Sequence, residues 1–404
     1  MKYAIIIPDG CADKPIEALG GKTPLQAANI PNMNAVARDG LVALTDNVPT
    51  QFPAGSEIAN MTLFGYDPSV YFTGRAPIEA AAQGISLGPN DWAVRCNVVT
   101  IIDQVMKDFT AGHISTAEST SLLKSLSEIV NHPQLQFIPG VSYRNLMIYR
   151  GKDGEQPPFS VDTRTIAPHD LTDLSVADDY PRGRGSDLLA EIMNTSASLF
   201  ADHPVNKKRA SEGKAVATNV WLWGLGGSPQ LPSFESRFGL RGAMITAVDL
   251  LRGLAALIGW DRIEVEGATG YLDTNYAGKG QAAVDALDKY DIVCVHVEAT
   301  DEASHEGRHD AKIQALEAID QHIVGPVRQK LASCGEHRLL VLPDHPTPCT
   351  TKKHCHGMVP MAVCGTGISG FGDCYNEASA SGSPFQFTEG WKMIEQFLRG
   401  SWKS

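Results

Sequence analysis

The chain has 404 residues, of which 43% are apolar and 20% are charged, with a formal net charge of −12 and an isoelectric point near 5.5. This composition is typical of a soluble globular protein, and the length predicts two domains rather than one core. The acidic balance excludes a general nucleic-acid binder, which would carry a basic surface, although a local arginine cluster or a metal ion can still attract an anionic substrate.

The N-terminal segment MKYAIIIPDG predicts a buried first strand, because its short apolar run is stopped by Pro8 and Asp9. A signal peptide would need a longer apolar region, and no segment approaches the roughly 18 apolar residues of a membrane span. The eight cysteines are scattered without a framework spacing. We therefore expect free thiols, a cytoplasmic location and no membrane partner.

The first 90 residues alternate short apolar runs with helical patterns. Strands are predicted over residues 3–7 (YAIII) and 41–47 (LVALTDN). Helices are predicted over residues 23–40, between an initial proline and a terminal glycine, and over residues 76–85.

The middle of the chain has a different character. Two β-rich runs, residues 92–103 and 145–151, flank a predicted helix at 116–130. A loop-rich stretch follows at 151–186, and then a helix at 186–203. These patterns predict a separate α/β unit.

After about residue 215 the first pattern returns. Strands are predicted at 217–227, 290–300, 337–345 and 359–367, and helices at 244–260 and 310–331. Alternating strands and helices predict a parallel sheet with right-handed crossovers. We therefore expect an α/β domain with a mainly parallel sheet flanked by helices (residues 1–89 and 215–404), interrupted by a smaller inserted α/β domain (residues 90–214).

Acidic side chains follow three of the predicted strands: Asp9, Asp301 and Asp344, the last followed directly by His345. Active sites in open α/β sheets lie beyond the carboxyl ends of the strands, so these groups should share one edge. Three converging carboxylates would repel one another unless a cation lay between them. The pattern therefore predicts a metal site.

Asp301 and His305 are spaced i,i+4 and lie on one face if the segment is helical. Such a pair suits Zn²⁺ or Mn²⁺. Taken alone, it is more typical of a helix N-cap and a surface histidine.

The segment PDHPTPCTTKKHCH adds His354 and His356. One alternative is a polar loop, and another is a structural zinc site that also uses Cys349 and Cys355, although their spacing is wider than the usual knuckle. The full set predicts a two-metal site of mixed oxygen and nitrogen donors, formed by Asp9, Asp301, His305, Asp344, His345 and one of His354 and His356.

Ser56 lies in QFPAGSEIAN, between a turn and a predicted helix start. It is either a helix N-cap or a nucleophile. A serine hydroxyl is a weak nucleophile that needs a base or a metal, and a metal could hold it in line with a phosphoryl group. Both roles are compatible, because anions bind well at helix N-termini.

The chain resembles the archaeal-type 2,3-bisphosphoglycerate-independent phosphoglycerate mutases of the alkaline phosphatase superfamily. The likeness covers nearly the whole chain, in order, and is carried by PDGCADKP, FPAGSEIANMTLFGYDP, YFTGRAPIEAAAQGI, HPVN, GATGYLDTN, ATDEASHEGRHDAK with EAID, and PDH followed by HCHGMVP. It implies a phosphatase-like core with an inserted substrate-binding domain, and interconversion of 3-phosphoglycerate and 2-phosphoglycerate through a phosphoserine.

The resemblance also implies residue roles. Ser56 would be the nucleophile, one metal would be held by Asp9, Ser56, Asp344 and His345, and the other by Asp301, His305 and His354. Manganese is the usual metal in the family, with zinc or magnesium as alternatives, and 2,3-bisphosphoglycerate is not required. Here HCHGMVP departs from the more usual HTADPVP, so His356 stays an alternative to His354.

The inserted domain should supply arginines, which bind a carboxylate and a phosphate in a bidentate way. Each candidate could equally be a solvated surface residue. The substrate-binding candidates are His113, Arg144, Arg164, His169, Arg182 and Arg184, with Arg95 as a further arginine.

Two other classes of function remain open from the sequence. A related phosphoryl-transfer enzyme, such as a homoserine kinase or a phosphate-ester hydrolase, could use the same chemistry, although no P-loop is present. A metal-binding structural protein is disfavoured, because a closed structural site keeps no open position for a reactive serine. The sequence does not determine the oligomeric state.

Overall fold

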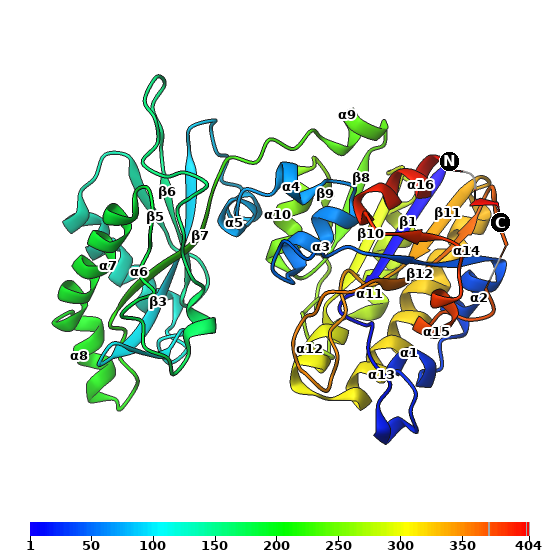
Figure 1. Ribbon diagram of the computed structural model, residues 1–404, viewed down its shortest axis with the longest axis horizontal. Coiled ribbons are helices and arrows are strands. Elements are labelled where there is room, and N and C mark those ends of the chain that lie inside the picture. The colour runs from blue at the N-terminus through cyan, green and yellow to red at the C-terminus, as the bar shows by residue number, and fades with distance from the viewer. Residues whose placement is uncertain (371, 401, 404) are drawn as a thin grey trace. The chain divides into compact units, whose positions relative to one another are not determined.

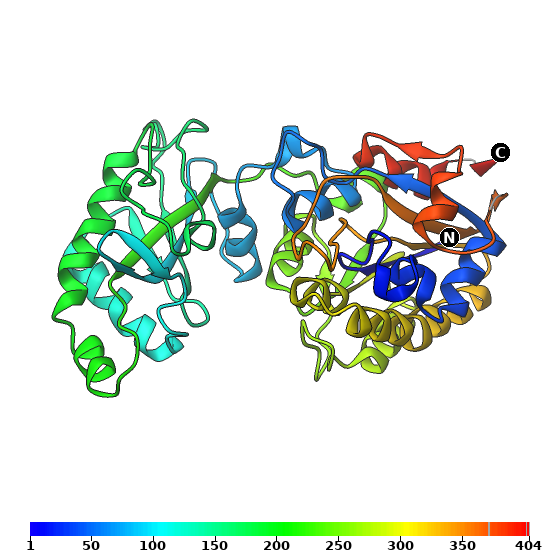
Figure 2. The same cartoon turned by 60° about the horizontal axis from the view of Figure 1, so that its bottom comes forward.

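The computed structural model describes residues 1–370, 372–400 and 402–403, without the side chain of Lys403. The chain forms two compact units: unit 1, residues Met1–Phe72 and Leu231–Ser404, and unit 2, residues Thr73–Gln230. Each unit has its own sheet and its own helices (Figures 1 and 2).

Unit 1 is built on an eight-stranded sheet. In spatial order its strands are β14 (Gln386–Phe387), β2 (Gly40–Thr45), β12 (Val359–Gly365), β11 (His337–Val341), β1 (Lys2–Pro8), β10 (Ile292–Val297), β8 (Gly242–Ile245) and β9 (Asp261–Arg262). Only β12 runs against its neighbours. A separate two-stranded ribbon joins β13 (Ile368–Ser369) and β15 (Trp402–Lys403).

The helices of unit 1 cover both faces of this sheet (Figure 1). They are α1 (Pro24–Ala27), α2 (Pro31–Asp39), α3 (Ser56–Leu63), α4 (Pro68–Tyr71), α9 (Phe234–Phe238), α10 (Asp249–Leu257), α11 (Tyr276–Ala286), α12 (Ala299–Glu306), α13 (His309–Ile319), α14 (Gly325–Ser333), α15 (Glu377–Ser381) and α16 (Met393–Arg399). Two 3₁₀ turns, η1 (Glu17–Leu19) and η4 (Gly390–Lys392), and a π-helical segment, η3 (Asp320–Val324), complete the unit.

Strand β1 shows why the sheet needs helices on both faces. Ala4 and Ile6 pack into the main apolar core with α2, α11 and α14, whereas the ring of Tyr3 contacts Phe397 of α16 at a centroid distance of 5.7 Å. Residues 3 to 8 of β1 are all buried. A strand buried on both faces reads as a continuous apolar run, which is why YAIII was readable from sequence.

Unit 2 is centred on an antiparallel sheet in the order β4 (Val105–Asp108), β3 (Trp92–Ile102), β6 (Arg144–Tyr149) and β5 (Leu135–Ile138), with β7 (Asn219–Gly227) also paired to β3. Its helices are α5 (Arg75–Ala82), α6 (Thr116–Val130), α7 (Ser186–Ala201) and α8 (Pro204–Ser211), with a 3₁₀ turn η2 (Pro168–Leu171) in the long loop. Helix α6 has the bounds predicted from sequence, because Ser115 and Glu118 form a capping box at its start.

The α/β class, the mainly parallel sheet and the interruption by a second unit are confirmed. The expected boundaries at 89/90 and 214/215 fall inside unit 2. Helix α5 belongs to this unit because it packs on β3 and β7, where Ala76, Ala80 and Ala93 share a small apolar cluster. The strand predicted at 217–227 therefore belongs to the inserted unit, not to the parallel sheet.

Several predicted helices have different bounds: the helix expected at 310–331, for example, is α13, η3 and α14 in succession. Two others differ for a reason that the structure shows. The helix expected at 23–40 is two helices, since Pro31 lacks an N–H group and Ala28 has an extended backbone. The helix expected at 244–260 begins only at Asp249, because Met244 and Ile245 complete strand β8. A short apolar run does not by itself distinguish a buried strand from a helical turn.

Candidate active site

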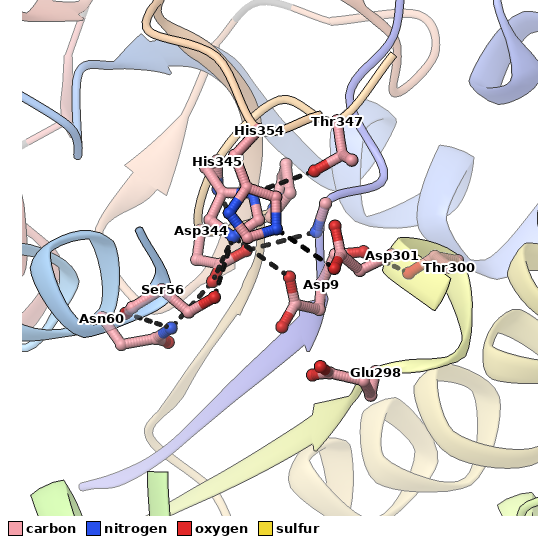
Figure 3. Close-up of polar contacts among 12 residues, drawn as sticks. Asp9, Ser56, Asn60, Glu298, Thr300, Asp301, Asp344, His345, Thr347 and His354 are labelled. Carbon is pink, nitrogen blue, oxygen red and sulfur yellow. Dashed lines mark hydrogen bonds and ion pairs between the residues drawn. The ribbon is translucent and has the colours of Figure 1, made fainter. Parts of the chain in front are cut away.

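The predicted acidic edge is present in unit 1. Strand β1 pairs in parallel with both β10 and β11, so the three strands end at the same edge. Asp9 directly follows β1, Asp344 lies just beyond β11, and β10 leads into α12, which carries Asp301. All three carboxylates are buried and converge in Figure 3.

Ser56 is the first residue of α3, and Gly55 is the N-cap residue. The N-cap alternative for Ser56 is therefore wrong. Its Oγ lies 3.1 Å from Nε2 of His345 (Figure 3). The Nδ2 group of Asn60, one helical turn later, donates to the Ser56 carbonyl at 3.0 Å and to Oδ2 of Asp344 at 2.7 Å. Asn60 thus ties the start of α3 to the loop after β11.

The first group of candidate ligands surrounds His345. Its Nε2 lies 3.5 Å from Oδ1 of Asp9 and 3.4 Å from Oδ2 of Asp344. Its Nδ1 lies 3.0 Å from the Thr347 hydroxyl, which orients the ring. The carbonyl of Thr347 accepts a hydrogen bond from buried Lys312 at 3.0 Å, so helix α13 supports this loop.

The second group contains Asp301, His305 and His354. The i,i+4 pair on α12 is confirmed: Nε2 of His305 lies 3.0 Å from Oδ2 of Asp301. Nε2 of His354 lies 3.3 Å from the same oxygen and 3.0 Å from Nε2 of His305. Three donor atoms from α12 and the loop before β12 therefore face one point, the geometry of a tridentate metal site.

His356 lies outside both groups. It is exposed, and its Nε2 lies 2.9 Å from the carbonyl of Phe52. The zinc alternative is not supported either, because no cysteine joins a potential ligand group in the part of the chain that the structure describes. All eight cysteines are free thiols, as predicted.

Burial and mutual repulsion dominate the electrostatics of the first group. Burial raises the pKa of Asp9 well above its usual value, and the charges of Asp344, Glu298 and Asp301 raise it further. Burial likewise raises the pKa of Glu298 to about 7. These carboxyls therefore resist ionising together unless a cation is close.

In the second group, hydrogen bonds outweigh burial. Burial would raise the pKa of Asp301, but hydrogen bonds with His305 and His354 hold it well below its usual value. The hydrogen bond to Asp301 raises the pKa of His305 to about 9. A cation bound at this point would stabilise the Asp301 carboxylate as these hydrogen bonds do.

The donor sets fit divalent metal ions. Oδ1 of Asp9 and Oδ1 of Asp301 are buried and have no hydrogen-bond partner among the described residues. An unsatisfied buried carboxylate oxygen is costly, and a metal ion would satisfy it. Carboxylate and imidazole donors together suit Mn²⁺ or Zn²⁺.

Sequence reasoning missed four neighbours of these groups: His296, Asn60 and Thr347, which are buried, and Glu298, which is half-buried. His296 on β10 lies 2.8 Å from Oδ2 of Asp9, and Glu298 follows on the same segment. The sequence VCVHVEAT could have indicated His296 and Glu298, because these polar residues interrupt a strand that is otherwise apolar. Nearby Lys279 is fully buried, donates to the His296 carbonyl at 3.2 Å, and has its pKa lowered by burial to about 8.

The substrate-binding candidates all lie in unit 2, and their side chains are exposed. The ring of His169 packs on Phe109 and Trp223, and Arg144 lies over the ring of Tyr143 at 5.3 Å. Phe109 also packs on Tyr143, so one aromatic row joins His169 to Arg144.

The remaining candidates are arranged differently. Arg164 and Arg182 are adjacent through paired backbone hydrogen bonds, and Arg184 bonds Gln156 and the Pro157 carbonyl. His113 lies in a turn with a φ of 49°. Arg95 is buried between Glu79, at 2.8 Å, and the ring of Trp223.

Comparison with known proteins gives the family. A family model described as 2,3-bisphosphoglycerate-independent phosphoglycerate mutase matches residues 37–206. The chain is 44% identical to the 2,3-bisphosphoglycerate-independent phosphoglycerate mutase of Methanothrix thermoacetophila, over 99% of this chain and 100% of that protein. It is 46% identical to the Methanosarcina barkeri enzyme of the same name, over 90% of each chain. The chain therefore belongs to the 2,3-bisphosphoglycerate-independent phosphoglycerate mutase family.

Solved structures agree with this family. The cofactor-independent phosphoglycerate mutase of Thermoplasma acidophilum superposes with a TM-score of 0.68 at 25% identity and covers 99% of both chains. A Pyrococcus horikoshii protein superposes with a TM-score of 0.82 at 26% identity, over 100% of this chain and 98% of that one. None of the helices in the described part of the chain combines the length and apolar character that crossing a membrane requires.

The two neighbouring histidines provide a matched test of the second group. We expect His354→Ala to lower Mn²⁺ affinity by more than the about 10- to 100-fold typical of losing an outer-shell partner, because it removes a donor that faces Asp301 and His305. His356→Ala should leave the affinity unchanged. Isothermal titration calorimetry of the metal-free variants measures both Mn²⁺ affinities. Weaker Mn²⁺ binding in His356→Ala, with unchanged binding in His354→Ala, would make His356 the ligand in place of His354.

Proposed function

We propose that the protein interconverts 3-phosphoglycerate and 2-phosphoglycerate without 2,3-bisphosphoglycerate, through a phosphoserine on Ser56. The observation that carries this proposal is the position of the Ser56 hydroxyl, 3.1 Å from His345 at the edge where the buried acids converge. Membership of the mutase family supports the choice of substrate.

The two ligand groups would hold two divalent metal ions, for which Mn²⁺ is our proposal: Asp9, Ser56, Asp344 and His345 for one ion, and Asp301, His305 and His354 for the other. When bound, such ions lower the pKa of a hydroxyl and offset the negative charge on phosphoryl oxygens. The residues themselves fix the geometry. Thr347 orients His345, and Asn60 holds the Ser56 backbone against Asp344.

The reaction needs two matched transfers. Ser56 Oγ gives up its proton and attacks phosphorus, the bond from phosphorus to the glycerate oxygen breaks, and that oxygen takes up a proton in exchange. The glycerate then presents its other hydroxyl, which gives up its proton and attacks the phosphoserine, and the released Ser56 oxygen takes up a proton. Burial lowers the pKa of His345, which favours the neutral ring that a metal ion binds. Its Nε2 and the Ser56 Oγ lie 3.1 Å apart, so both atoms could face one ion.

A mutase must also retain the glycerate between the two transfers and exclude water from the phosphoserine. We propose that unit 2 is the substrate-binding domain. Its exposed candidates His113, Arg144, Arg164, His169, Arg182 and Arg184 offer the guanidinium and imidazole groups that bind a carboxylate and a phosphate.

Replacing the nucleophile gives the first test of this function. In an enolase-coupled assay with 3-phosphoglycerate, Mn²⁺ and no 2,3-bisphosphoglycerate, Ser56→Ala should lose at least about 10³-fold in kcat, since the covalent route is gone. Ser228→Ala is the matched control and should keep its activity, because the Ser228 hydroxyl bonds the Leu87 carbonyl and the side chain of exposed Gln230. If the unaltered protein releases free phosphate and forms no 2-phosphoglycerate, it is a phosphatase, and the proposal is wrong.

Arginine variants test the role of unit 2. Arg164→Ala and Arg182→Ala should each raise the KM for 3-phosphoglycerate by about 10- to 100-fold, the loss expected for one hydrogen bond to a charged group, without changing Mn²⁺ affinity. Arg150→Ala is the control, because Arg150 is paired to Asp91 at 2.6 Å within the same unit. If the KM for 3-phosphoglycerate is no higher in Arg164→Ala and Arg182→Ala than in Arg150→Ala, these two arginines do not bind substrate.

A further inference from the structure

A buried chain of hydrogen bonds ends on Asp9. His296 of β10 is fully buried, and its Nε2 lies 2.8 Å from Oδ2 of Asp9. Its other ring nitrogen, Nδ1, lies 3.1 Å from the hydroxyl of Thr246, just beyond β8. Strands β8, β10 and β1 are adjacent in the sheet, so the chain runs across three neighbouring strands toward the candidate metal groups.

The hydrogen bonds select one tautomer of His296. With a metal ion bound, Asp9 is ionised and its carboxylate can only accept, so Nε2 of the neutral His296 ring carries the proton. Nδ1 is then an acceptor and needs a donor. The Thr246 hydroxyl supplies it, because its oxygen already accepts from the backbone N–H of Val248 at 3.1 Å and its own proton is directed to the ring.

The two carboxylate oxygens of Asp9 therefore have different partners. Oδ2 accepts the hydrogen bond from His296, whereas Oδ1 has no hydrogen-bond partner among the described residues and lies 3.5 Å from Nε2 of His345. In Figure 3 the dashed line between Asp9 and His345 marks this side of the carboxylate. The free oxygen is thus on the side where Ser56 lies.

The backbone of Asp9 is already fixed, so only its side chain can still rotate. The Asp9 N–H donates to the Val297 carbonyl at 3.0 Å, and the Thr300 hydroxyl donates to the Asp9 carbonyl. The backbone of His296 is fixed too, since Lys279 donates to its carbonyl at 3.2 Å. The imidazole is therefore the group that sets the rotation of the Asp9 carboxylate.

We propose that Thr246 and His296 form a positioning relay that holds Oδ2 of Asp9 and thereby reserves Oδ1 for a metal ion beside Ser56. The inference rests on the proposed function, because it treats Asp9 as a metal ligand. Partners of this kind commonly orient metal ligands, and their loss costs about 10- to 100-fold in metal affinity.

The test measures Mn²⁺ binding rather than turnover. Metal-free full-length protein is titrated with Mn²⁺, and free Mn²⁺ is followed by electron paramagnetic resonance. Two matched pairs of variants are compared: His296→Leu with His296→Gln, whose amide can still donate to Asp9, and Thr246→Val with Thr246→Ser, which keeps the hydroxyl. Thr274→Val is the control, because Thr274 is another buried threonine of unit 1, and its hydroxyl accepts a hydrogen bond from the Thr269 N–H.

We expect two Mn²⁺ sites in the unaltered protein. His296→Leu should weaken one of them by about 10- to 100-fold, Thr246→Val should weaken the same site less, and the Gln and Ser variants should recover most of the loss. Thr274→Val should bind both ions normally. Thermal unfolding of the metal-free variants shows whether each is folded, and Thr246→Val carries the test if His296→Leu is not.

Three results would overturn the relay. The first is normal binding at both sites in His296→Leu and Thr246→Val. The second is equal damage in the conservative and non-conservative variants. The third is complete loss of one of the two bound Mn²⁺ ions in His296→Leu, with the other site unchanged, which would make His296 a ligand. If the unaltered protein binds two ions but forms no 2-phosphoglycerate, the proposed function fails while the binding test of the relay still stands.

Discussion

The convergence of buried carboxylates at one edge of the unit 1 sheet is the constraint on which the rest of the structure depends. Asp9, Asp301 and Asp344 are at most 3% exposed. Removing an ion from water costs several kcal/mol even after the protein relaxes. Three such groups would therefore strongly destabilise the folded protein in the absence of metal. Cations bound between them would turn this cost into binding energy. The site thus fits divalent metal ions, whose positive charge could also hold the negative oxygens of a phosphoryl group.

The architecture explains how residues far apart in the sequence reach this edge. Parallel pairing of β1 with β10 and β11 brings three strand ends together, and the loop before β12 adds His354. Helix α3 then presents Ser56 at its first turn, while its Asn60 bonds Asp344. Unit 2 interrupts the chain between α4 and α9, outside the strands that form the site. An insertion at this point leaves the candidate metal ligands of unit 1 undisturbed.

Much of the site was readable from sequence, for a physical reason. Asp9, Asp301, Asp344 and His345 follow buried strands, and strand ends in a parallel sheet meet at one edge. Residues within strands were harder to assign: His296 reads as part of an apolar run, and only the structure shows its bond to Asp9. The membership of β7 was missed because strand pairing is a long-range property that local pattern does not carry. The roles of the exposed arginines of unit 2 depend on where a substrate binds, and the sequence does not show that position.

The most direct test of two metal ions at this edge is a crystal structure of the Mn²⁺-bound protein with anomalous data at the manganese edge. The account predicts two peaks, one within reach of Asp9, Asp344, His345 and the Ser56 hydroxyl, and one among Asp301, His305 and His354. A single peak, or a peak on Cys349, Cys355 and His356 instead, would contradict it.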